Sequence, residues 1–438
     1  MNEPHQYQVP FGKATIKFDL PPRMRGTIAV SNPVEPVKDA WSEIKSALKS
    51  PFGSRKLHQL ASQGQRVCII FTDITRSSPD HLLVPALLDE LELAGVREED
   101  ITLLCGIGMH RSSTPEEKIE KLGREIVQRY RVIDNEPQNL NALVDLGTTS
   151  SGVPVLVHRA VIEAELTLAT GIVEPHQYAG YSGGRKTLAI GAAGEATIAK
   201  THGPEFIDHE GTRLGRIDGN PFHVAVTEVA RMAGLRFILN VVLDDKKRIL
   251  RVAAGDPDLA FNDLVMFARS IYETPIPHQY DIVIGGVGYP KDSNLYQASR
   301  APTYLFFAPL PVVKPGGFLI IPARCEEGAG AGVGEQRFLK AMRDAPDINY
   351  ILADARRNGY PPGQQRAFVL AKVLEQAQIV IVGSEHPDLV SDCKMIPAAT
   401  MEEALELAKQ SLGRSCQVLV VPNAMQTLPI VQFNSFSC

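Results

Sequence analysis

Short runs of apolar, often β-branched residues alternate along this chain with longer amphipathic stretches. Successive positions in each run are apolar, so both faces of each strand are expected to be buried, as in the centre of a parallel sheet. The predicted strands cover residues 66–71, 101–105, 166–169, 281–284, 317–321, 379–382 and 418–421. Strands that alternate with helices in this way predict the α/β fold class, with mainly parallel sheets.

Local signals mark one helix with particular clarity. Thr114 fits the N-cap, Pro115 the first turn and Glu117 a capping box. Gly123 fits the end of the same helix, because glycine adopts the conformation that a helix end often needs. A second amphipathic stretch, residues 37–48, is expected to pack on the first domain.

The domain organisation is predicted from a proline-containing segment, residues 272–280, which precedes a new strand. We therefore expect an N-terminal α/β domain over residues 1–275 and a C-terminal α/β domain over residues 276–412. A length of 438 residues agrees with two or three folding units. We expect the active site in the cleft between the two domains.

Polar side chains gather directly after four of the predicted strands. These loops read Thr72-Asp73-Ile-Thr-Arg76, Gly106-Ile-Gly-Met-His110, Thr170-Gly-Ile-Val-Glu174-Pro-His176 with Gly180-Tyr-Ser182-Gly183-Gly184-Arg-Lys186, and Gly286-Val-Gly-Tyr-Pro-Lys-Asp-Ser-Asn294-Leu-Tyr296-Gln297-Ala-Ser-Arg300. In open α/β sheets, ligands bind at the carboxyl ends of the strands. Four loops with polar side chains therefore predict an active site at the carboxyl ends of the strands.

Each of these residues also has a structural interpretation when it is taken alone. Asp73 is suited to capping the following helix, and His202 to ending the helix before it. Arg76 fits a simple ion pair, and Lys186 a simple anion contact. The functional interpretation depends on the residues occurring together, in order, after successive strands.

Several familiar motifs are absent from the chain. Residues 180–187 miss the spacing of a phosphate-binding P-loop, and neither Gly106-x-Gly108 nor Gly286-x-Gly288 continues to the third glycine of a dinucleotide-binding loop. His209-Glu210 is not followed by the second histidine of a zinc protease, and no Gly-x-Ser-x-Gly elbow occurs. These absences disfavour a nucleoside triphosphatase, a standard NAD dehydrogenase and a zinc protease.

Composition narrows the class of protein further. The chain has 45 basic and 50 acidic residues, a net charge of -5, which argues against a general nucleic-acid surface. No apolar run reaches membrane-spanning length and no signal peptide is recognisable, so we expect no membrane association. Six cysteines without CxxC spacing predict reduced, mostly buried thiols in a cytoplasmic protein.

The ordered set of motifs resembles the nickel-dependent lactate racemase family. The resemblance extends from near the start of the chain to its end. It is carried by Asp73-Ile-Thr-Arg76, His110 after its glycine loop, Glu174-Pro-His176, Ser182-Gly-Gly-Arg-Lys186, His202 and Asn294-Leu-Tyr-Gln297. Each motif is weak alone, whereas the combination is specific. The resemblance, together with the last predicted strand, leads us to expect that residues 413–438 return to the first domain.

The resemblance implies a cofactor and partners. The cofactor is a nickel pincer nucleotide, pyridinium-3-thioamide-5-thiocarboxylic acid mononucleotide with Ni(II), made by separate cofactor-assembly enzymes. Lys186 would bind it covalently, and His202 would be the protein ligand to nickel. Asp73, Ser182, Gly183 and Gly184 would lie against it, the glycines because missing side chains allow close backbone approach.

The implied reaction is racemisation or epimerisation of a small 2-hydroxy acid. Hydride moves to the cofactor and back while a histidine takes the hydroxyl proton, and two bases, His110 and His176, serve the two enantiomers. The substrate-binding residues would be Arg76, Tyr296, Gln297 and Arg300. The planar guanidinium groups of the two arginines are suited to a carboxylate.

Departures from the family pattern fall on the substrate side. The pattern ends Tyr-Gln-x-x-Lys, whereas this chain has Arg300 at the last position. Gln365 occupies the place where members often have a tryptophan, and Ser77 stands where many have proline. We therefore expect a 2-hydroxy acid other than lactate.

Two alternatives remain at the level of sequence. One is a metal-dependent hydrolase or lyase that uses His110, His176 and His202 as metal ligands. The other is a non-enzymatic metabolite-binding protein on the same fold.

Overall fold

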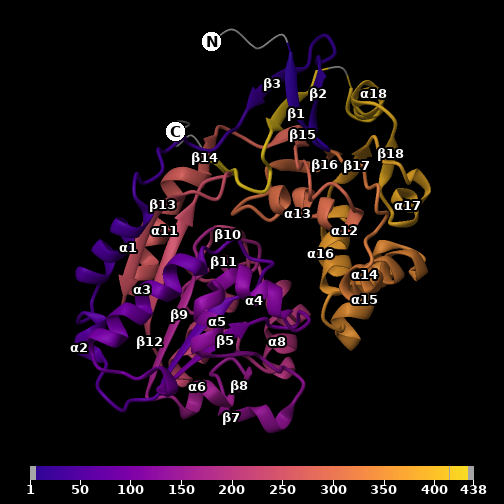
Figure 1. Cartoon of the computed structure of the whole chain (residues 1–438). Coiled ribbons are helices and arrows are strands. Elements are labelled where there is room, and N and C mark those ends of the chain that lie inside the picture. The colour runs from indigo at the N-terminus through magenta and orange to yellow at the C-terminus, as the bar shows by residue number, and fades with distance from the viewer. Residues whose placement is uncertain (1–5, 414, 433–438) are drawn as a thin grey trace, which may run out of the picture. The chain divides into compact units, whose positions relative to one another are not determined.

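The computed structural model describes residues 6–413 and 415–432. These residues form two compact units (Figure 1). Of the described residues, unit 1 comprises 6–32, 203–215, 271–413 and 415–432, and unit 2 comprises 33–202 and 216–270. The chain therefore passes between the units four times. Every helix within the described ranges is too short or too polar to span a bilayer.

Unit 2 is built on a six-stranded sheet. The strand order is β13 (Ile249–Gly255), β12 (Leu235–Leu243), β9 (Leu166–Ile172), β4 (Val67–Thr72), β5 (Ile101–Gly106) and β6 (Arg131–Asp134). All neighbours are parallel except β12 and β13, which are antiparallel. Because parallel strands share a direction, the carboxyl ends of β4, β5 and β9 meet at one edge of this sheet.

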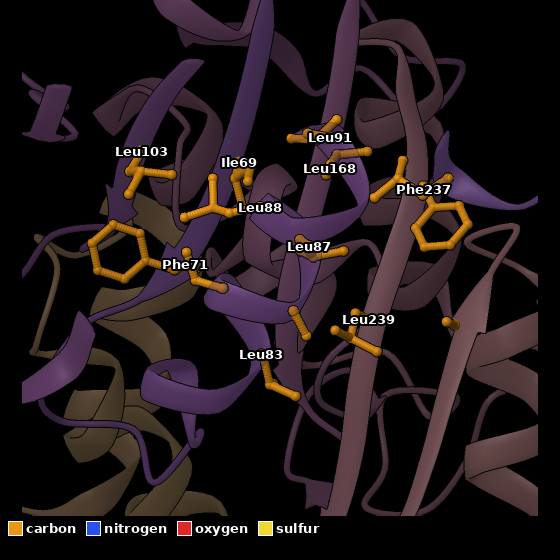
Figure 2. Close-up of a cluster of buried hydrophobic side chains, with 14 of the residues drawn as sticks. Ile69, Phe71, Leu83, Leu87, Leu88, Leu91, Leu103, Leu168, Phe237 and Leu239 are labelled. Atoms are coloured by element: carbon orange, nitrogen blue, oxygen red, sulfur yellow. The ribbon is translucent and has the colours of Figure 1, made fainter. Parts of the chain in front are cut away.

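Leucines of α3 (Asp80–Leu93) form the core on one face of this sheet. Figure 2 shows Leu83, Leu87, Leu88 and Leu91 packed against Ile69 and Phe71 of β4, Leu103, Leu168, Phe237 and Leu239. Alternate residues of a strand face opposite sides, and Ile70 accordingly faces Gly106 and α7 (Lys186–Ala189) on the other side. The sheet is thus covered on both faces, which explains why its central strands are apolar throughout.

The remaining elements of unit 2 are helices and short hairpins around this sheet. The helices are α1 (Ala40–Lys49), α2 (Leu57–Leu60), α4 (Pro115–Leu122), α5 (Arg124–Arg129), α6 (Arg159–Glu163), α8 (Glu195–Thr201), α10 (Pro221–Met232) and α11 (Leu259–Tyr272), with short 3₁₀ turns at Glu98–Asp100 and Leu140–Ala142. The hairpins are β7 (Leu143–Thr148) with β8 (Pro154–His158), and β10 (Pro175–His176) with β11 (Gly180–Tyr181). The capping box predicted at Thr114 and Glu117 is confirmed at the start of α4. Ile44 and Leu48 of α1 join the unit 2 core, as predicted for this amphipathic stretch.

Unit 1 has its own six-stranded sheet, in which all neighbours are parallel. The strand order is β18 (Ile396–Ala398), β17 (Gln378–Val382), β16 (Val313–Pro322), β15 (Tyr280–Gly285), β19 (Gln417–Val421) and β3 (Arg25–Ile28). The hairpin β1 (Tyr7–Phe11) and β2 (Ala14–Phe18) packs with α18 (Met401–Leu412) in one core cluster against this sheet. Strands β14 (Glu273–Ile276) and β20 (Leu428–Val431) pair in parallel.

The other helices of unit 1 are α9 (Pro204–Ile207), α12 (Leu295–Ala298), α13 (Arg300–Phe306), α14 (Val333–Asp344), α15 (Ile348–Asn358), α16 (Gln365–Leu374) and α17 (Pro387–Asp392). All seven predicted strands are present, with bounds that differ by a few residues. The α/β class with mainly parallel sheets, arranged as two units, is therefore confirmed.

The predicted division of the chain is wrong at both ends of the chain and also at residues 203–215, which belong to unit 1 although they were expected in the N-terminal domain. The last strand, β19, does not return to the first domain but pairs with β15 and β3 in the unit 1 sheet. The N-terminal strands also belong to unit 1, although they were expected within a domain of residues 1–275. Strand β19 is largely buried, as expected for a central strand of a parallel sheet, and it lies between β15 and β3. Residues 1–5, 414 and 433–438 of these segments lie outside the described residues.

Candidate active site

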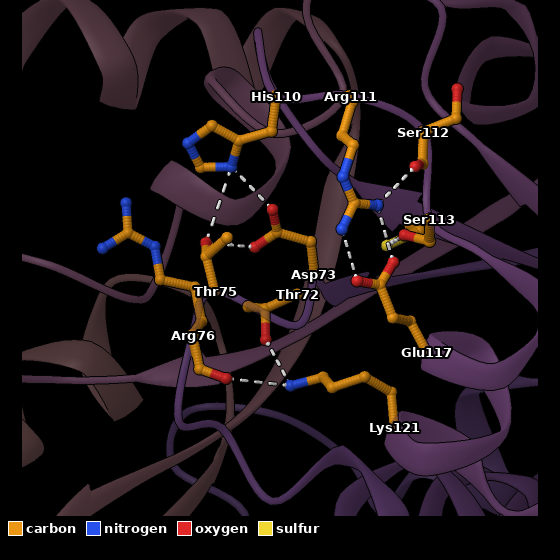
Figure 3. A network of polar contacts seen from close by, with 11 residues as sticks. Thr72, Asp73, Thr75, Arg76, His110, Arg111, Ser112, Ser113, Glu117 and Lys121 are labelled. Atoms are coloured by element: carbon orange, nitrogen blue, oxygen red, sulfur yellow. Dashed lines mark hydrogen bonds and ion pairs between the residues drawn. The ribbon is translucent and has the colours of Figure 1, made fainter. Parts of the chain in front are cut away.

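Asp73 and His110 lie side by side at the carboxyl ends of β4 and β5. The His110 Nδ1 atom is 2.6 Å from Asp73 Oδ2, and the Thr75 hydroxyl donates to the other carboxylate oxygen at 2.7 Å (Figure 3). A carboxylate only accepts hydrogen bonds, so His110 carries its proton on Nδ1 and its lone pair on Nε2. Asp73 is buried, whereas the His110 side chain is half exposed. The outer nitrogen of His110 is thus set up to accept a proton.

The electrostatics of this loop keep Asp73 ionised. Burial raises the pKa of Asp73, but the hydrogen bonds from His110 and Thr75 and the charges of His110 and Arg76 outweigh burial and hold that pKa below its usual range. Within the part of the chain that the structure describes, no carboxylate lies within 4.0 Å of the Arg76 guanidinium. A cation without an ion-pair partner beside a fixed histidine can bind the carboxylate of a substrate.

Lys186 and His176 form a second close pair. The Lys186 Nζ atom is 2.8 Å from His176 Nε2. The backbone N–H groups of Tyr178 and Ala179 both donate to His176 Nδ1, at 3.2 Å. A neutral histidine that accepts at Nδ1 carries its proton on Nε2, so this proton faces the lysine nitrogen. The Lys186 amine therefore lies directly against the outer ring nitrogen of His176.

His202 ends helix α8 close to this second pair. Its Nδ1 atom donates to the Ile198 carbonyl at 2.9 Å, which leaves the lone pair on Nε2. Burial, together with the charge of Lys186, lowers the pKa of His202 to about 4, so the ring is neutral near pH 7. Phe222 packs edge-on against His202 at 5.0 Å between ring centroids and also contacts His176 at 6.5 Å. His176, Lys186 and His202 are therefore brought together in unit 2.

The glycine loop before Lys186 is closely packed against its surroundings. A Cβ atom on Gly183 would lie 2.7 Å from the Ile172 carbonyl oxygen, and one on Gly184 would lie 2.7 Å from the Phe261 ring. The Ser182 hydroxyl donates to the Ile172 carbonyl at 2.8 Å. A side chain at Gly183 or Gly184 would therefore collide with protein atoms, so close packing requires glycine at both positions. Cofactor contact by this loop remains a prediction.

Sequence reasoning missed two groups that hold the loop in place. The buried Asn240 of β12 accepts the Gly184 N–H at 2.7 Å. The buried Arg185 contacts His223 Nε2 at 3.0 Å and lies over Phe261, 4.5 Å from the ring centroid. Burial, together with Arg185, lowers the pKa of His223 to about 4. An asparagine within an apolar strand was the available sequence signal for Asn240, whereas nothing local singled out His223.

The other predicted site residues lie in unit 1. Tyr296 and Gln297 are in α12, and Arg300 begins α13 and donates to Gln297 Oε1 at 3.3 Å. Sequence reasoning missed the buried Arg366, which lies 5.7 Å from the Tyr296 ring centroid and donates to Thr303 Oγ1 at 3.0 Å. Gln365 accepts the Gly363 N–H at 2.5 Å and so orders its own loop. Tyr296, Gln297 and Arg300 therefore lie close together within unit 1.

The alternative of a three-histidine metal site has no support from the geometry. Among residues 6–413 and 415–432, no cluster of three or more histidine, cysteine, aspartate or glutamate side chains could hold a metal ion. Cysteine chemistry is disfavoured too, because burial raises the pKa of Cys105, beneath the His110 loop, to about 12.

A histidine whose tautomer is fixed by a buried carboxylate is typical of acid–base enzymes, and here it stands where α/β enzymes bind their ligands. Comparison with known proteins agrees with this class. Residues 11–215 match the family model of the lactate racemase N-terminal domain, and residues 277–428 match that of the lactate racemase C-terminal domain.

Two curated relatives cover most of the chain, and both are named lactate racemase. The protein from Thermoanaerobacterium thermosaccharolyticum is 31% identical over 424 residues, which cover 96% of this chain and 98% of that protein. The protein from Lactiplantibacillus plantarum is 33% identical over 387 residues, 87% of this chain and 89% of that protein.

Solved structures agree in fold. The structure of the lactate racemase apoprotein from T. thermosaccharolyticum has a TM-score of 0.86 and 30% identity, and the match covers 97% of this chain and 100% of that one. A crystal structure of a Thermotoga maritima protein, at a TM-score of 0.65 and 17% identity, covers 92% of this chain and 100% of that one and shares the fold. The chain belongs to the lactate racemase family and is an isomerase of the racemase type.

Proposed function

We propose that the protein racemises or epimerises a 2-hydroxy acid by reversible hydride transfer, with His110 and His176 as acid–base groups. The observation that carries the proposal is the pair formed by Asp73 and His110 beside the Arg76 guanidinium. An arginine can hold the substrate carboxylate while a histidine with its lone pair on Nε2 takes the hydroxyl proton.

The residues of unit 2 fit the nickel pincer nucleotide of the family. His202 offers a neutral imidazole whose Nδ1 proton is committed to the Ile198 carbonyl, so Nε2 is the nitrogen that would bind nickel. A single imidazole cannot hold a metal ion without further ligands. His202 alone therefore suits a nickel ion whose other ligands come from the organic cofactor. Lys186 would hold that ligand covalently. When bound, the group supplies the hydride acceptor that a weakly acidic C–H bond requires.

The chain's own residues handle the substrate and the protons. Arg76 would bind the carboxylate with its two parallel N–H groups and so keep the reacting carbon in one orientation. His110 would accept the hydroxyl proton at Nε2, and Asp73 would stabilise the imidazolium that forms. Asp73 accepts from His110 and Thr75, so we propose that it orients His110 in addition to the nucleotide contact expected of it.

His176 has the opposite tautomer from His110, with its proton on Nε2. To serve the second enantiomer as a base at Nε2, His176 must carry its proton on Nδ1 instead, where the Tyr178 and Ala179 N–H groups could then no longer donate to it. Tethering of Lys186 would convert the amine that faces His176 into an amide nitrogen without the positive charge of the amine. We propose that this conversion readies His176 for its catalytic role.

We propose a substrate other than lactate, which is the substrate in the names of both curated relatives. Arg300 presents a guanidinium beside Gln297 and Tyr304, and Gln365 supplies a polar side chain where a tryptophan is common. These changes suit a longer or more polar 2-hydroxy acid. We also propose that the protein works in the cytoplasm, where cofactor-assembly enzymes would load it.

Intact-mass measurement tests the cofactor. Protein produced together with the cofactor-assembly enzymes should gain mass and nickel, and protein produced without them should be inactive. Lys186→Ala should abolish the mass gain, whereas Lys200→Ala, on α8, should retain it. Activity in protein made without the assembly enzymes would overturn the cofactor assignment.

A screen of paired 2-hydroxy acid enantiomers with loaded enzyme tests the substrate. We expect one pair to be interconverted with kcat/KM at least about 100-fold above that for lactate, the discrimination that one added polar contact can supply. Lactate turnover far above that of every other pair would contradict the substrate proposal and leave the cofactor assignment intact.

A further inference from the structure

Helix α4 lies under both loops that carry the Asp73–His110 pair. Lys121, in its last turn, has a side chain that is only 7% exposed. Lysine is almost never buried unless its charge is compensated. Figure 3 shows the Lys121 ammonium directed at Thr72 and at the backbone carbonyl of Arg76.

The ammonium contacts span the whole loop between β4 and α3. Lys121 Nζ donates to the Arg76 carbonyl at 3.2 Å, the Ser78 carbonyl at 2.9 Å and the Thr72 hydroxyl at 3.1 Å. It also forms an ion pair with Asp80 Oδ2 at 2.8 Å. The bonds to Arg76 and Ser78 are to backbone atoms, so they depend on the path of the loop rather than on its side chains.

Asp80, which is fully buried, closes the loop from the other side. Its carboxylate accepts from Thr72 at 2.7 Å, Ser78 at 2.9 Å and Thr170 of β9 at 2.6 Å. Thr72 precedes the loop and Ser78 ends it, so the Lys121–Asp80 pair joins the two ends of the loop and ties them to a neighbouring strand. Such a network is rigid because every buried polar group in it has a partner.

The same helix also holds the other half of the pair. Arg111, next to His110, makes two hydrogen bonds to Glu117 of α4, at 2.8 and 2.6 Å. Glu117 in turn accepts the Thr114 N–H at 2.8 Å in the capping box. Helix α4 therefore holds the His110 loop at its first turn and the Asp73 loop at its last turn.

We propose that Lys121 is a positioning residue that holds the loop between β4 and α3 where Asp73 meets His110 and where Arg76 can reach the substrate. The proposal rests on the proposed function for the roles of His110 and Arg76. Lys121 touches neither the substrate nor the reacting atoms and acts through the backbone of the loop. Its loss should therefore alter catalysis beyond any loss of stability, because the loop would no longer be held at its two ends.

The first test compares Lys121→Met with Lys118→Met in cofactor-loaded enzyme. Lys118 lies one turn earlier on α4 and pairs with Asp134 at 2.8 Å, without a bond to the loop. In the folded fraction, Lys121→Met should lower kcat about 10- to 100-fold, the usual cost of misplacing a catalytic group by about 1 Å. Lys118→Met should leave kcat within about twofold of wild type, as expected for a residue remote from the site.

A second variant covers the case in which Lys121→Met fails to fold because Asp80 is left as a buried lone charge. The double variant Lys121→Met with Asp80→Asn removes both charges and still lacks the ammonium donors. It should show the same loss of kcat. Wild-type kcat in a folded double variant would overturn the proposal.

A measurement made without substrate can test the positioning role of Lys121 independently of the proposed racemase function. In protein with ¹⁵N-labelled histidine, NMR reports the His110 tautomer, which Asp73 holds with the proton on Nδ1 in the wild type. Lys121→Met, or the double variant, should shift the His110 signals toward mixed tautomers, and Lys118→Met should not. Unchanged His110 signals in a folded variant would overturn the positioning role. A shift in a protein without racemase activity would leave that role standing and refute the proposed function instead.

Discussion

At the scale of single residues, the contact between Asp73 and His110 has the clearest chemical consequence. Because the carboxylate is buried and ionised, it selects one tautomer of His110 and stabilises the ring when it gains a proton. Thr75 holds the carboxylate from the other side. The three side chains come from two loops, so their meeting depends on the adjacency of β4 and β5.

Asp73→Asn should therefore lower kcat by about 100-fold or more, since an amide lacks the charge that stabilises the imidazolium. Thr75→Val should cost less, because the carboxylate stays in place. Steady-state kinetics of loaded enzyme measure both effects, and intact mass gives the degree of loading. If Asp73→Asn fails to gain the cofactor mass while the His110 tautomer stays unchanged, the result would instead favour a role for Asp73 in holding the cofactor.

At the scale of elements, the turn between β11 and α7 depends on backbone conformations that side chains oppose. Gly183 has φ 77° and faces the Ile172 carbonyl, and Gly152, in the β7–β8 hairpin, also has φ 77° but has nothing within 4 Å of its Cβ position. The two glycines thus separate the cost of the left-handed conformation from the cost of a steric clash.

Gly152→Ala should lower the free energy of unfolding by about 1 kcal/mol, the cost of placing an ordinary residue at positive φ. Gly183→Ala should lower it by about 3 kcal/mol or more, because a backbone carbonyl must also move. Urea unfolding of the protein without cofactor measures both values. Equal losses would mean that the loop adjusts freely around Lys186.

At the scale of the whole molecule, buried histidines make stability depend on pH. His223 has a folded pKa of about 4, below its usual value of 6.5, because it is buried beside Arg185. As the pH falls below 6.5, the unfolded chain binds a proton that the folded chain does not bind until about pH 4. Stability is therefore lost over this window as the pH decreases.

The loss from His223 should be at most about 1.4 kcal/mol per pH unit. His223→Gln keeps an acceptor for Arg185 but does not titrate, so its free energy of unfolding should fall less between pH 6.5 and 5 than that of the wild type. Urea unfolding of the unloaded protein at several pH values measures the two slopes. Parallel slopes would show that His223 is solvated in the folded protein.

Local properties of the sequence determined the α/β class, the seven apolar strands, the capped helix α4 and the loops that carry Asp73, His110, His176 and Lys186. These features could be predicted because apolar periodicity and capping act over a few residues, and because parallel strands bring their carboxyl ends to one edge. The order of the motifs along the chain was enough to indicate the family.

The tertiary structure alone decided which distant segments pair. β19 joined β15 and β3 rather than the unit 2 sheet, and Lys121, Arg366 and Asn240 acquired buried polar partners far away in sequence. An apolar strand carries no local record of its neighbours, and a lysine near a helix end normally lies in solvent. Pairing and burial depend on how the whole chain packs, so residue type and spacing could not determine them.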